Sequence, residues 1–230
     1  MKIKVFADEY SVAQEAAAII AAEAREAVAD RGRFVMALSG GRTPWAMLRS
    51  LIALDVPWER VLLAQVDERV APVGDPLRNL THISEILLQN HRIDPKQVYA
   101  MPVEEEDLSS AASRYATILR EIAGAPPVLD LVHLGLGPDG HTASLLPEDP
   151  VLEITGEDVA LTGLYQGTRR MTLTYPIINR SRMILWLVTG GEKTEVVERL
   201  WNGDQSIPCG RIRRDNSLIL ADTAAAGQLG

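Results

Sequence analysis

Apolar runs of five or six residues recur along the chain and predict buried strands. The runs at residues 34–38, 61–66 and 183–188 are almost wholly apolar, as is typical of strands covered on both faces. Between strands lie helical patterns, of which the clearest is the Ala-rich segment that we expect Ser11 to cap. This alternation predicts an α/β fold with a mostly parallel sheet and helices on both faces. We expect residues 1–230 to form a single domain.

Residues 128–136 form another apolar run, which ends in Gly135-Leu136-Gly137-Pro138-Asp139-Gly140 and is followed at once by His141. A buried strand that ends in a glycine turn before a helix presents backbone N–H groups and one side chain to a ligand. The glycines formally match the dinucleotide-binding pattern. That match is weak, because it lies mid-chain and no second strand ends in an acidic residue at the expected distance.

We therefore interpret this glycine turn as a device that presents His141. A histidine near a helix N-terminus is held neutral, which suits a general base near neutral pH. The other histidines have simpler interpretations: His82 and His91 are expected at the surface, and His133 in the core. No metal-ligand spacing joins His141 to another histidine or cysteine, so the sequence predicts no metal site.

Three further strands end in polar or glycine-rich clusters. These are Ser39-Gly40-Gly41-Arg42-Thr43, Asp67-Glu68-Arg69 and Gly190-Gly191-Glu192-Lys193. Because the carboxyl ends of parallel strands meet at one edge of a sheet, we expect these clusters and the His141 turn to share one cleft.

The two glycine clusters suit a phosphate. Glycines let backbone N–H groups converge without Cβ clashes, and a helix N-terminus favours an anion. Thr43 is expected to cap the helix that begins at Pro44, and Lys193 would reach a phosphate as a point charge. Tight strand-to-helix turns with solvated Arg42 and Lys193 side chains are the alternative.

The charged cluster has two interpretations. Charges directly after a buried strand cost desolvation free energy unless they are paired or used. Asp67 therefore either belongs to the site or forms a structural ion pair with Arg69 or another arginine. Arg170, near the start of a later predicted strand, has the same two interpretations.

Composition narrows the class of protein. A net charge of −8 without a basic block argues against a nucleic-acid partner. The single cysteine, Cys209, indicates a reducing compartment and is expected to be a small packed residue. No apolar run has the length of a membrane span, and no signal-peptide core follows Met1. We expect a cytoplasmic protein, monomeric or weakly homo-oligomeric, without a membrane partner.

In order along the chain, these motifs resemble those of the 6-phosphogluconolactonase family, and the resemblance covers nearly the whole length. Its most specific block is Gly135-Leu136-Gly137-Pro138-Asp139-Gly140-His141-Thr142-Ala143-Ser144-Leu145. The others are Leu38-Ser39-Gly40-Gly41-Arg42-Thr43-Pro44, Asp67-Glu68-Arg69-Val70, Arg170-Met171-Thr172-Leu173-Thr174, Val188-Thr189-Gly190-Gly191-Glu192-Lys193 and Leu220-Ala221-Asp222-Thr223-Ala224-Ala225.

The resemblance implies a modified Rossmann-like fold, shared with glucosamine-6-phosphate deaminases. It also implies hydrolysis of a sugar-phosphate lactone of the pentose phosphate pathway without a metal or cofactor. His141 would activate the water, with Arg69 and Asp67 also catalytic. The implied substrate-binding residues are Ser39, Gly40, Gly41, Arg42, Thr43, Asp139, Gly140, Arg170 and Lys193.

Two residues depart from the family pattern. Relatives often have serine or threonine where Arg42 stands, and serine where Arg78 precedes Asn79. Arg42 could strengthen phosphate binding, whereas Arg78 puts in doubt the usual substrate contact of residues 75–79.

The expected mechanism assigns the oxyanion to Arg69 or to backbone N–H groups of residues 137–140, with Asp67 orienting Arg69 or the substrate hydroxyls. One alternative is a glucosamine-6-phosphate deaminase or isomerase, whose motif resembles Asp-Glu followed by an aromatic residue, with Asn-Glu-Pro after the Gly-His segment. Arg69 after Glu68, and Thr142 after His141, favour the lactonase. Another is a non-catalytic sugar-phosphate sensor on the same fold.

Overall fold

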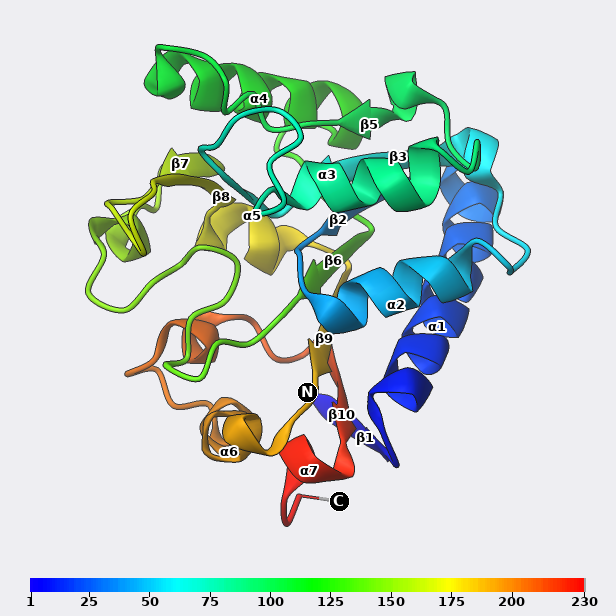
Figure 1. The fold of residues 1–230 in the computed structure, drawn as a ribbon, viewed down its shortest axis with the longest axis vertical. Helices are drawn as coiled ribbons and strands as arrows, with labels where there is room; N and C mark the ends of the chain where they lie inside the picture. The colour runs from blue at the N-terminus through cyan, green and yellow to red at the C-terminus, as the bar shows by residue number, and fades with distance from the viewer. Residues whose placement is uncertain (230) are drawn as a thin grey trace.

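Seven parallel strands form the main sheet of the protein, in the order β1-β10-β9-β6-β2-β3-β5 (Figure 1). The structure is a computed structural model and describes residues 1–229. Sheet order reverses between β2 and β6, which is where doubly wound proteins bind ligands. In sheet order the strands are β1 (Lys2–Phe6), β10 (Ser217–Asp222), β9 (Met183–Val188), β6 (Leu131–Leu134), β2 (Phe34–Leu38), β3 (Val61–Gln65) and β5 (Val98–Tyr99).

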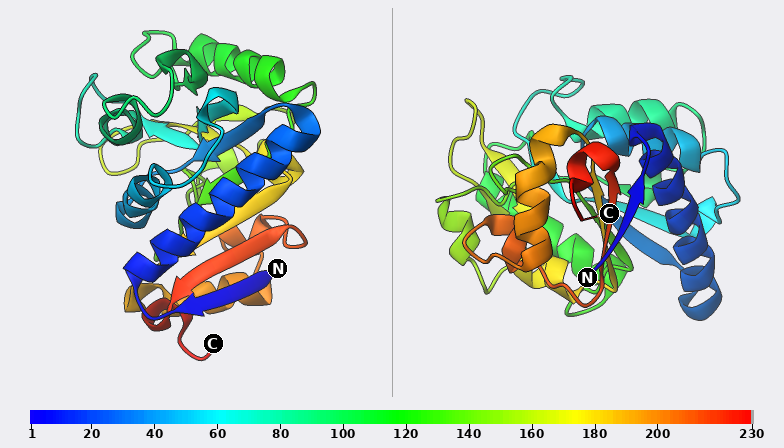
Figure 2. Two further views of the ribbon diagram at one scale, coloured as in Figure 1. Left: turned by 90° about the vertical axis from the view of Figure 1, so that its right-hand side faces the viewer. Right: turned by 90° about the horizontal axis from the view of Figure 1, so that it is seen from below.

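Helices cover both faces of this sheet, so the predicted α/β class is confirmed (Figure 2). On one face α1 (Glu9–Arg31), α2 (Arg42–Leu51) and α3 (Asn79–Ile83) pack on strand residues such as Met36. The other face is covered by α4 (Leu108–Ala123), α5 (Tyr175–Arg180), α6 (Thr194–Asn202) and α7 (Thr223–Ala226). Alternate side chains of one strand enter the two cores, as the pleat requires.

Six short helical segments complete the connections. One π-helical turn, Ser84–Leu88, continues α3. The 3-10 helices are Trp58–Arg60, Pro95–Gln97, Pro150–Glu153, Gly191–Lys193 and Pro208–Arg211. Within residues 1–229, no helix has the length and apolar character needed to cross a membrane.

The protein also has a second, antiparallel sheet of three strands. The sequence predicts two of them, on either side of the turn at residues 166–168, but not the third strand or a separate sheet. Its order is β4 (Asp67–Arg69), β8 (Arg170–Leu173) and β7 (Val159–Leu161). Only Val66 separates β3 from β4, so the chain passes directly from the large sheet into the small one. The register places Asp67 opposite Thr172 and Arg69 opposite Arg170, which brings two predicted site arginines side by side.

Three local predictions were wrong at helix starts. Asp8, and not Ser11, caps α1: its carboxylate accepts the Ser11 N–H at 2.8 Å. Gly41 is the N-cap of α2, so Thr43 lies inside the helix. No helix begins directly after His141; an isolated bridge joins Thr142 to Leu145 instead, so a helix dipole does not act on the imidazole.

Candidate active site

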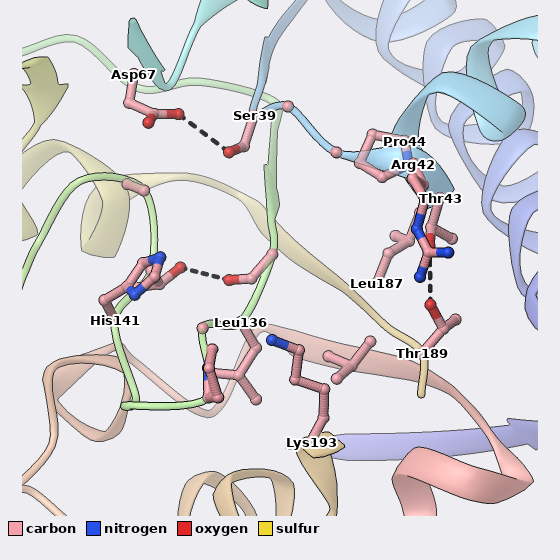
Figure 3. A pocket seen from close by; sticks show the side chains of 18 of the residues that line it. Ser39, Arg42, Thr43, Pro44, Asp67, Leu136, His141, Leu187, Thr189 and Lys193 are labelled. Atoms are coloured by element: carbon pink, nitrogen blue, oxygen red, sulfur yellow. Dashed lines mark hydrogen bonds between the residues drawn. The ribbon is translucent and has the colours of Figure 1, made fainter. Parts of the chain in front are cut away.

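A cleft of about 330 Å³ lies at the carboxyl edge of the parallel sheet, where the predicted clusters meet (Figure 3). In Figure 3, Lys193 extends toward the space that His141, Ser39 and Arg42 surround. The turn that carries His141 also contains two further candidates, Asp139 and Gly140. The candidates that line the cleft are Ser39, Gly40, Gly41, Arg42, Thr43, Asp67, Arg69, His141, Arg170 and Lys193.

Hydrogen bonds within its own turn hold the His141 segment. The Gly137 N–H donates to the His141 carbonyl at 2.8 Å, and the Gly140 N–H donates to the Gly137 carbonyl at 3.0 Å. A Cβ on Gly137 would stand 2.1 Å from His141 Nδ1, so any side chain there would displace the His141 ring. Because these two N–H groups are engaged, they are poor candidates for an oxyanion site.

Asp139 fixes the tautomer of His141. Its Oδ1 lies 2.5 Å from His141 Nδ1 and also accepts the His141 backbone N–H at 3.1 Å. Burial acts to raise the pKa of Asp139, but these hydrogen bonds and the attraction of the imidazole outweigh it and leave the pKa below its usual value. An ionised carboxylate only accepts hydrogen bonds, so Nδ1 carries the proton and Nε2 keeps a free lone pair.

The segment at residues 207–210 backs this turn. The Cys209 N–H donates to the Gly140 carbonyl at 2.9 Å, and a Cβ on Gly140 would stand 2.8 Å from Ile207 Cβ. Cys209 is itself fully buried, which raises the pKa of its thiol to about 12. The prediction that Cys209 is a small packed residue is confirmed.

Asp67 is a largely buried residue of the cleft wall, and its carboxylate accepts hydrogen bonds from two hydroxyl groups. Its Oδ1 accepts from Ser39 Oγ at 3.0 Å and its Oδ2 from Ser144 Oγ at 2.7 Å. The expected direct contact with Arg69 is absent among residues 1–229. Asn79 joins the two instead: its amide nitrogen donates to the Asp67 carbonyl at 2.8 Å, and its Oδ1 accepts from Arg69 Nη1 at 2.8 Å.

Arg69 of β4 and Arg170 of β8 lie directly opposite each other in the small sheet. Like charges directly opposite destabilise a strand pair unless a counter-charge lies between them. Desolvation, followed by repulsion from Arg69, lowers the pKa of Arg170. The Nε atom of Arg170 is buried and has no hydrogen-bond partner within residues 1–229. Both observations indicate a place for an anion.

In the glycine turn at residues 39–43, the backbone N–H groups are available to a ligand, whereas the hydroxyl groups already have partners in the protein. Ser39 donates its N–H to His133 Nδ1 at 3.3 Å and its hydroxyl to Asp67. The Thr43 hydroxyl lies 3.0 Å from a Glu9 carboxylate oxygen and 2.9 Å from Thr189 Oγ1. By contrast, the backbone N–H groups of residues 40–42 make no hydrogen bond within the part of the chain described.

The glycine turn approaches α3 so closely that a Cβ on Gly40 would lie 1.9 Å from Asn79 Oδ1.

Across the cleft from this glycine turn, Lys193 is the last residue of a 3-10 helix. Burial lowers the pKa of its ammonium group, and the nearby carboxylates of Glu192 and Asp139 act in the opposite direction. The turn and the ammonium group together offer an anion both N–H groups and a positive charge.

Arg78 points away from the cleft, although the sequence raised it as a departure near the substrate. Its side chain is fully buried, with Nε 3.6 Å from Glu68 Oε2, and Nη1 pairs with Glu104. Glu68 also accepts the backbone N–H groups of Arg69, Asn79 and Leu80, and the Gln65 side-chain amide. This ion pair fixes the end of β4 against the start of α3.

Three residues of the site were not singled out from the sequence: Asn79, Ser144 and Tyr165. Ser144 lies within the motif around His141, which is the signal that could have identified it. Tyr165 lies in the turn between β7 and β8, with its ring 5.9 Å from the His141 ring and 4.9 Å from the Arg170 guanidinium carbon. No motif marks it. Within residues 1–229, no group of three or more His, Cys, Asp or Glu side chains is arranged to hold a metal ion.

Fold and site together define a doubly wound α/β protein with a cationic, histidine-bearing cleft at the sheet edge. The family model described as glucosamine-6-phosphate isomerases/6-phosphogluconolactonase matches residues 7–220, and the chain belongs to that family. It is 36% identical to the 6-phosphogluconolactonase of Mycobacterium tuberculosis over 99% of this chain and 98% of that protein.

Solved structures agree on the fold. The chain is similar to 6-phosphogluconolactonase from Thermotoga maritima, with a TM-score of 0.83 and 26% identity, covering 96% of this chain and 98% of the other. It is also similar to a monomeric glucosamine-6-phosphate deaminase, with a TM-score of 0.86 and 21% identity over 98% and 99% of the two chains. The fold alone therefore does not separate lactonase from deaminase.

Proposed function

We propose that this chain hydrolyses 6-phospho-D-glucono-1,5-lactone to 6-phospho-D-gluconate, a step of the oxidative pentose phosphate pathway. Support comes from a curated lactonase that shares 36% of its residues over the full length. The observation that carries the proposal is the His141–Asp139 pair in a cleft lined by arginine and lysine side chains. The His141–Asp139 pair can activate a water molecule, and the cationic side chains can bind an anionic substrate beside it.

The proposed phosphate site lies between the two glycine turns. The free N–H groups of residues 40–42 donate to phosphate oxygens, while Arg170 and Lys193 supply charge. Arg42 adds a further cation at the rim. Ser39 and Thr43 act indirectly, because their donor groups already hold Asp67, Thr189 and Glu9.

The proposed chemical step begins at His141 Nε2, which takes a proton from water as the oxygen attacks the lactone carbonyl carbon. The resulting oxyanion is stabilised by Arg69, whose Nη1 is held in place by Leu77 and Asn79. Collapse of the tetrahedral intermediate breaks the bond to the ring oxygen, which receives the proton from the imidazolium. The Asp139 carboxylate stabilises that imidazolium while it exists.

The deaminase alternative fits the local sequence less well. That chemistry removes a carbon-bound proton, and the related motif resembles Asn-Glu-Pro after the Gly-His segment. Here Thr142, Ala143 and Ser144 follow His141, and Ser144 is already bonded to Asp67. A non-catalytic sensor would have no use for the fixed tautomer of His141.

The test generates the lactone in situ and follows 6-phosphogluconate formation above spontaneous hydrolysis, using an NADP-coupled assay. Wild type should accelerate the reaction, and His141→Ala should lower kcat by about 10² to 10⁴-fold. Calorimetry with 6-phosphogluconate should show that His141→Ala still binds the product. Turnover near wild type in His141→Ala would exclude His141 as the base. Product binding without any wild-type turnover would favour the sensor.

The proposal also covers setting and partners. A net charge of −8 and a single buried thiol support a cytoplasmic enzyme with a small sugar phosphate as its partner and no nucleic acid. We further propose that it acts as a monomer or a weak homo-oligomer, which sedimentation at micromolar concentration would test.

A further inference from the structure

The turn between β7 and β8 is a hydrogen-bonded hairpin tip, and its Tyr165 ring contacts two residues that line the cleft. Tyr165 and Thr168 exchange backbone hydrogen bonds of 2.9 and 3.2 Å around Gln166 and Gly167, whose φ angles are 52° and 82°. Two positive φ angles in a two-residue turn match the twist of the flanking strands. The Tyr165 backbone is therefore held by its own hairpin.

A second set of bonds ties the tip to the chain after β4. Thr168 Oγ1 donates to the Val70 carbonyl at 2.8 Å, and the Val70 N–H donates to the Arg169 carbonyl at 3.0 Å. Neighbouring side chains at the tip differ in their surroundings: Leu164 is 77% exposed, whereas the Tyr165 ring contacts two site residues. The tip therefore presents one particular ring to the site.

The Tyr165 ring meets the two site residues with different geometries. The Arg170 guanidinium carbon lies 4.9 Å from the ring centroid, within cation–π range. The His141 ring is edge-on to it, at 64° between planes and 5.9 Å between centroids. No hydrogen bond to the Tyr165 hydroxyl exists within residues 1–229, so the aromatic face makes these contacts.

Both neighbours have few other restraints. Within residues 1–229 the Arg170 guanidinium makes one long hydrogen bond, 3.5 Å from Nη1 to Ser144 Oγ. The His141 ring is bonded only at Nδ1, to Asp139, among the described residues. A ring that touches both side chains limits the rotation of each and links their positions.

We propose that Tyr165 is a positioning residue that aligns the base His141 and the phosphate-binding Arg170 together. This inference rests on the proposed lactone hydrolysis, in which those two residues act on opposite ends of one substrate. Binding of the phosphate to Arg170 then favours the imidazole orientation that takes a proton from water. The essential element is the aromatic face and not the hydroxyl.

The test compares Tyr165→Ala, Tyr165→Leu and Tyr165→Phe with a matched control, Leu164→Ala, at the same hairpin tip. Tyr165→Ala should raise KM about tenfold and lower kcat about tenfold. Tyr165→Leu keeps an apolar side chain without a π face and should behave like Tyr165→Ala. Tyr165→Phe and Leu164→Ala should stay within about twofold of wild type in both constants.

Binding of 6-phosphogluconate, measured by calorimetry, is the second readout and does not depend on turnover. Its Kd should rise about tenfold in Tyr165→Ala and remain unchanged in Tyr165→Phe. A Tyr165→Phe variant as impaired as Tyr165→Ala would overturn the role of the ring face. Unchanged kinetics and binding in Tyr165→Ala would overturn the whole inference.

The His141→Ala variant separates this inference from the proposed function. An inactive His141→Ala beside a fully active Tyr165→Ala overturns the positioning role alone. Absence of lactone hydrolysis in the wild type overturns the proposed function, and the binding measurements then still decide whether Tyr165 positions Arg170.

Discussion

His141, in the turn after β6, and Asp67, at the start of β4, face the same cleft but are held in different ways. The bonds to His141 come from its own turn, from Gly137 and Asp139. Asp67 is bonded by Ser39, 28 residues away, and by Ser144, 77 residues away. A group held locally can change without disturbing the fold, whereas a group held by distant segments is part of what joins them. The two regions should therefore respond differently to substitution.

Among the substitutions proposed, the largest effect is expected from replacing Glu68, in the small sheet, and it concerns stability. In Glu68→Gln, an amide nitrogen replaces a carboxylate oxygen that accepts hydrogen bonds from the Gln65 side chain and the Leu80 N–H. The substitution also leaves the buried Arg78 side chain with Glu104 as its one charged partner among residues 1–229. The free energy of unfolding should fall by about 3–5 kcal/mol, measured by urea denaturation. Glu104→Gln removes the exposed partner of the same arginine and should cost under about 1 kcal/mol. Equal losses in the two variants would show that Glu68 does no more for the small sheet than the exposed partner of Arg78.

The next largest effect is a pH dependence of stability that arises from His133. This histidine of β6 is fully buried and accepts the Ser39 N–H. Burial lowers its pKa to about 4, against partial opposition from the nearby Asp67 carboxylate. The unfolded chain therefore binds a proton near pH 6.5 that the folded chain does not, and stability falls as the pH drops from 6.5 to 4. The loss should approach about 3 kcal/mol.

Urea unfolding between pH 7 and pH 4 measures this loss. His133→Gln should show a weaker pH dependence than wild type, by up to about one proton, while His91→Gln at an exposed position should follow the wild-type curve. Parallel curves for wild type and His133→Gln would show that His133 does not titrate differently in the two states.

The third effect tests the locally held region. Asp139→Asn keeps the shape of the side chain and removes the charge that would stabilise the proposed imidazolium, so kcat should fall by about 10²-fold, the lower end of the range for general acid–base catalysis. The urea midpoint should remain close to wild type, because the contacts of Asp139 lie within its own turn. A large loss of stability would show that the His141 turn is as integrated into the fold as the small sheet.

The smallest effect is expected at Lys193, which is also locally held. Lys193→Met keeps the length of the side chain and removes one charge from the proposed phosphate site. KM should rise about tenfold with little change in kcat, because the lost interaction is equal in the ground and transition states. Lys96→Met, in a separate 3-10 helix, is the control. A fall in kcat instead would assign Lys193 to the reacting end of the substrate.

The sequence predicted the parallel sheet well, because strands buried on both faces are recognisable as apolar runs. Residues 34–38 and 183–188 are strands with the predicted bounds. Asp67–Arg69 could not be predicted as a strand, because three charged residues have no strand pattern of their own. Pairing with Thr172 and distant donors such as Ser144 make that strand stable, and neither is visible locally.

The residues of the candidate site likewise fall into two groups: those that a local motif predicts and those that distant segments position. The motifs around His141 and Ser39 predicted which groups meet in the cleft, since parallel strands end at one edge. The roles of Ser39 and Thr43 were less predictable, because their hydroxyls are engaged by Asp67 and Thr189 from other segments. Tyr165 was missed because hairpin geometry, and not a motif, brings it to His141.

Cys209 provides a reporter of motion at the turn that carries His141. Its thiol is buried, and the adjoining backbone N–H holds the Gly140 carbonyl, so an alkylating reagent reaches the sulfur only when this segment opens. In the native state the rate of alkylation thus measures how often the support beneath His141 detaches. Since this is the chain's single cysteine, one mass-spectrometric label reads that opening without engineering, with and without product bound.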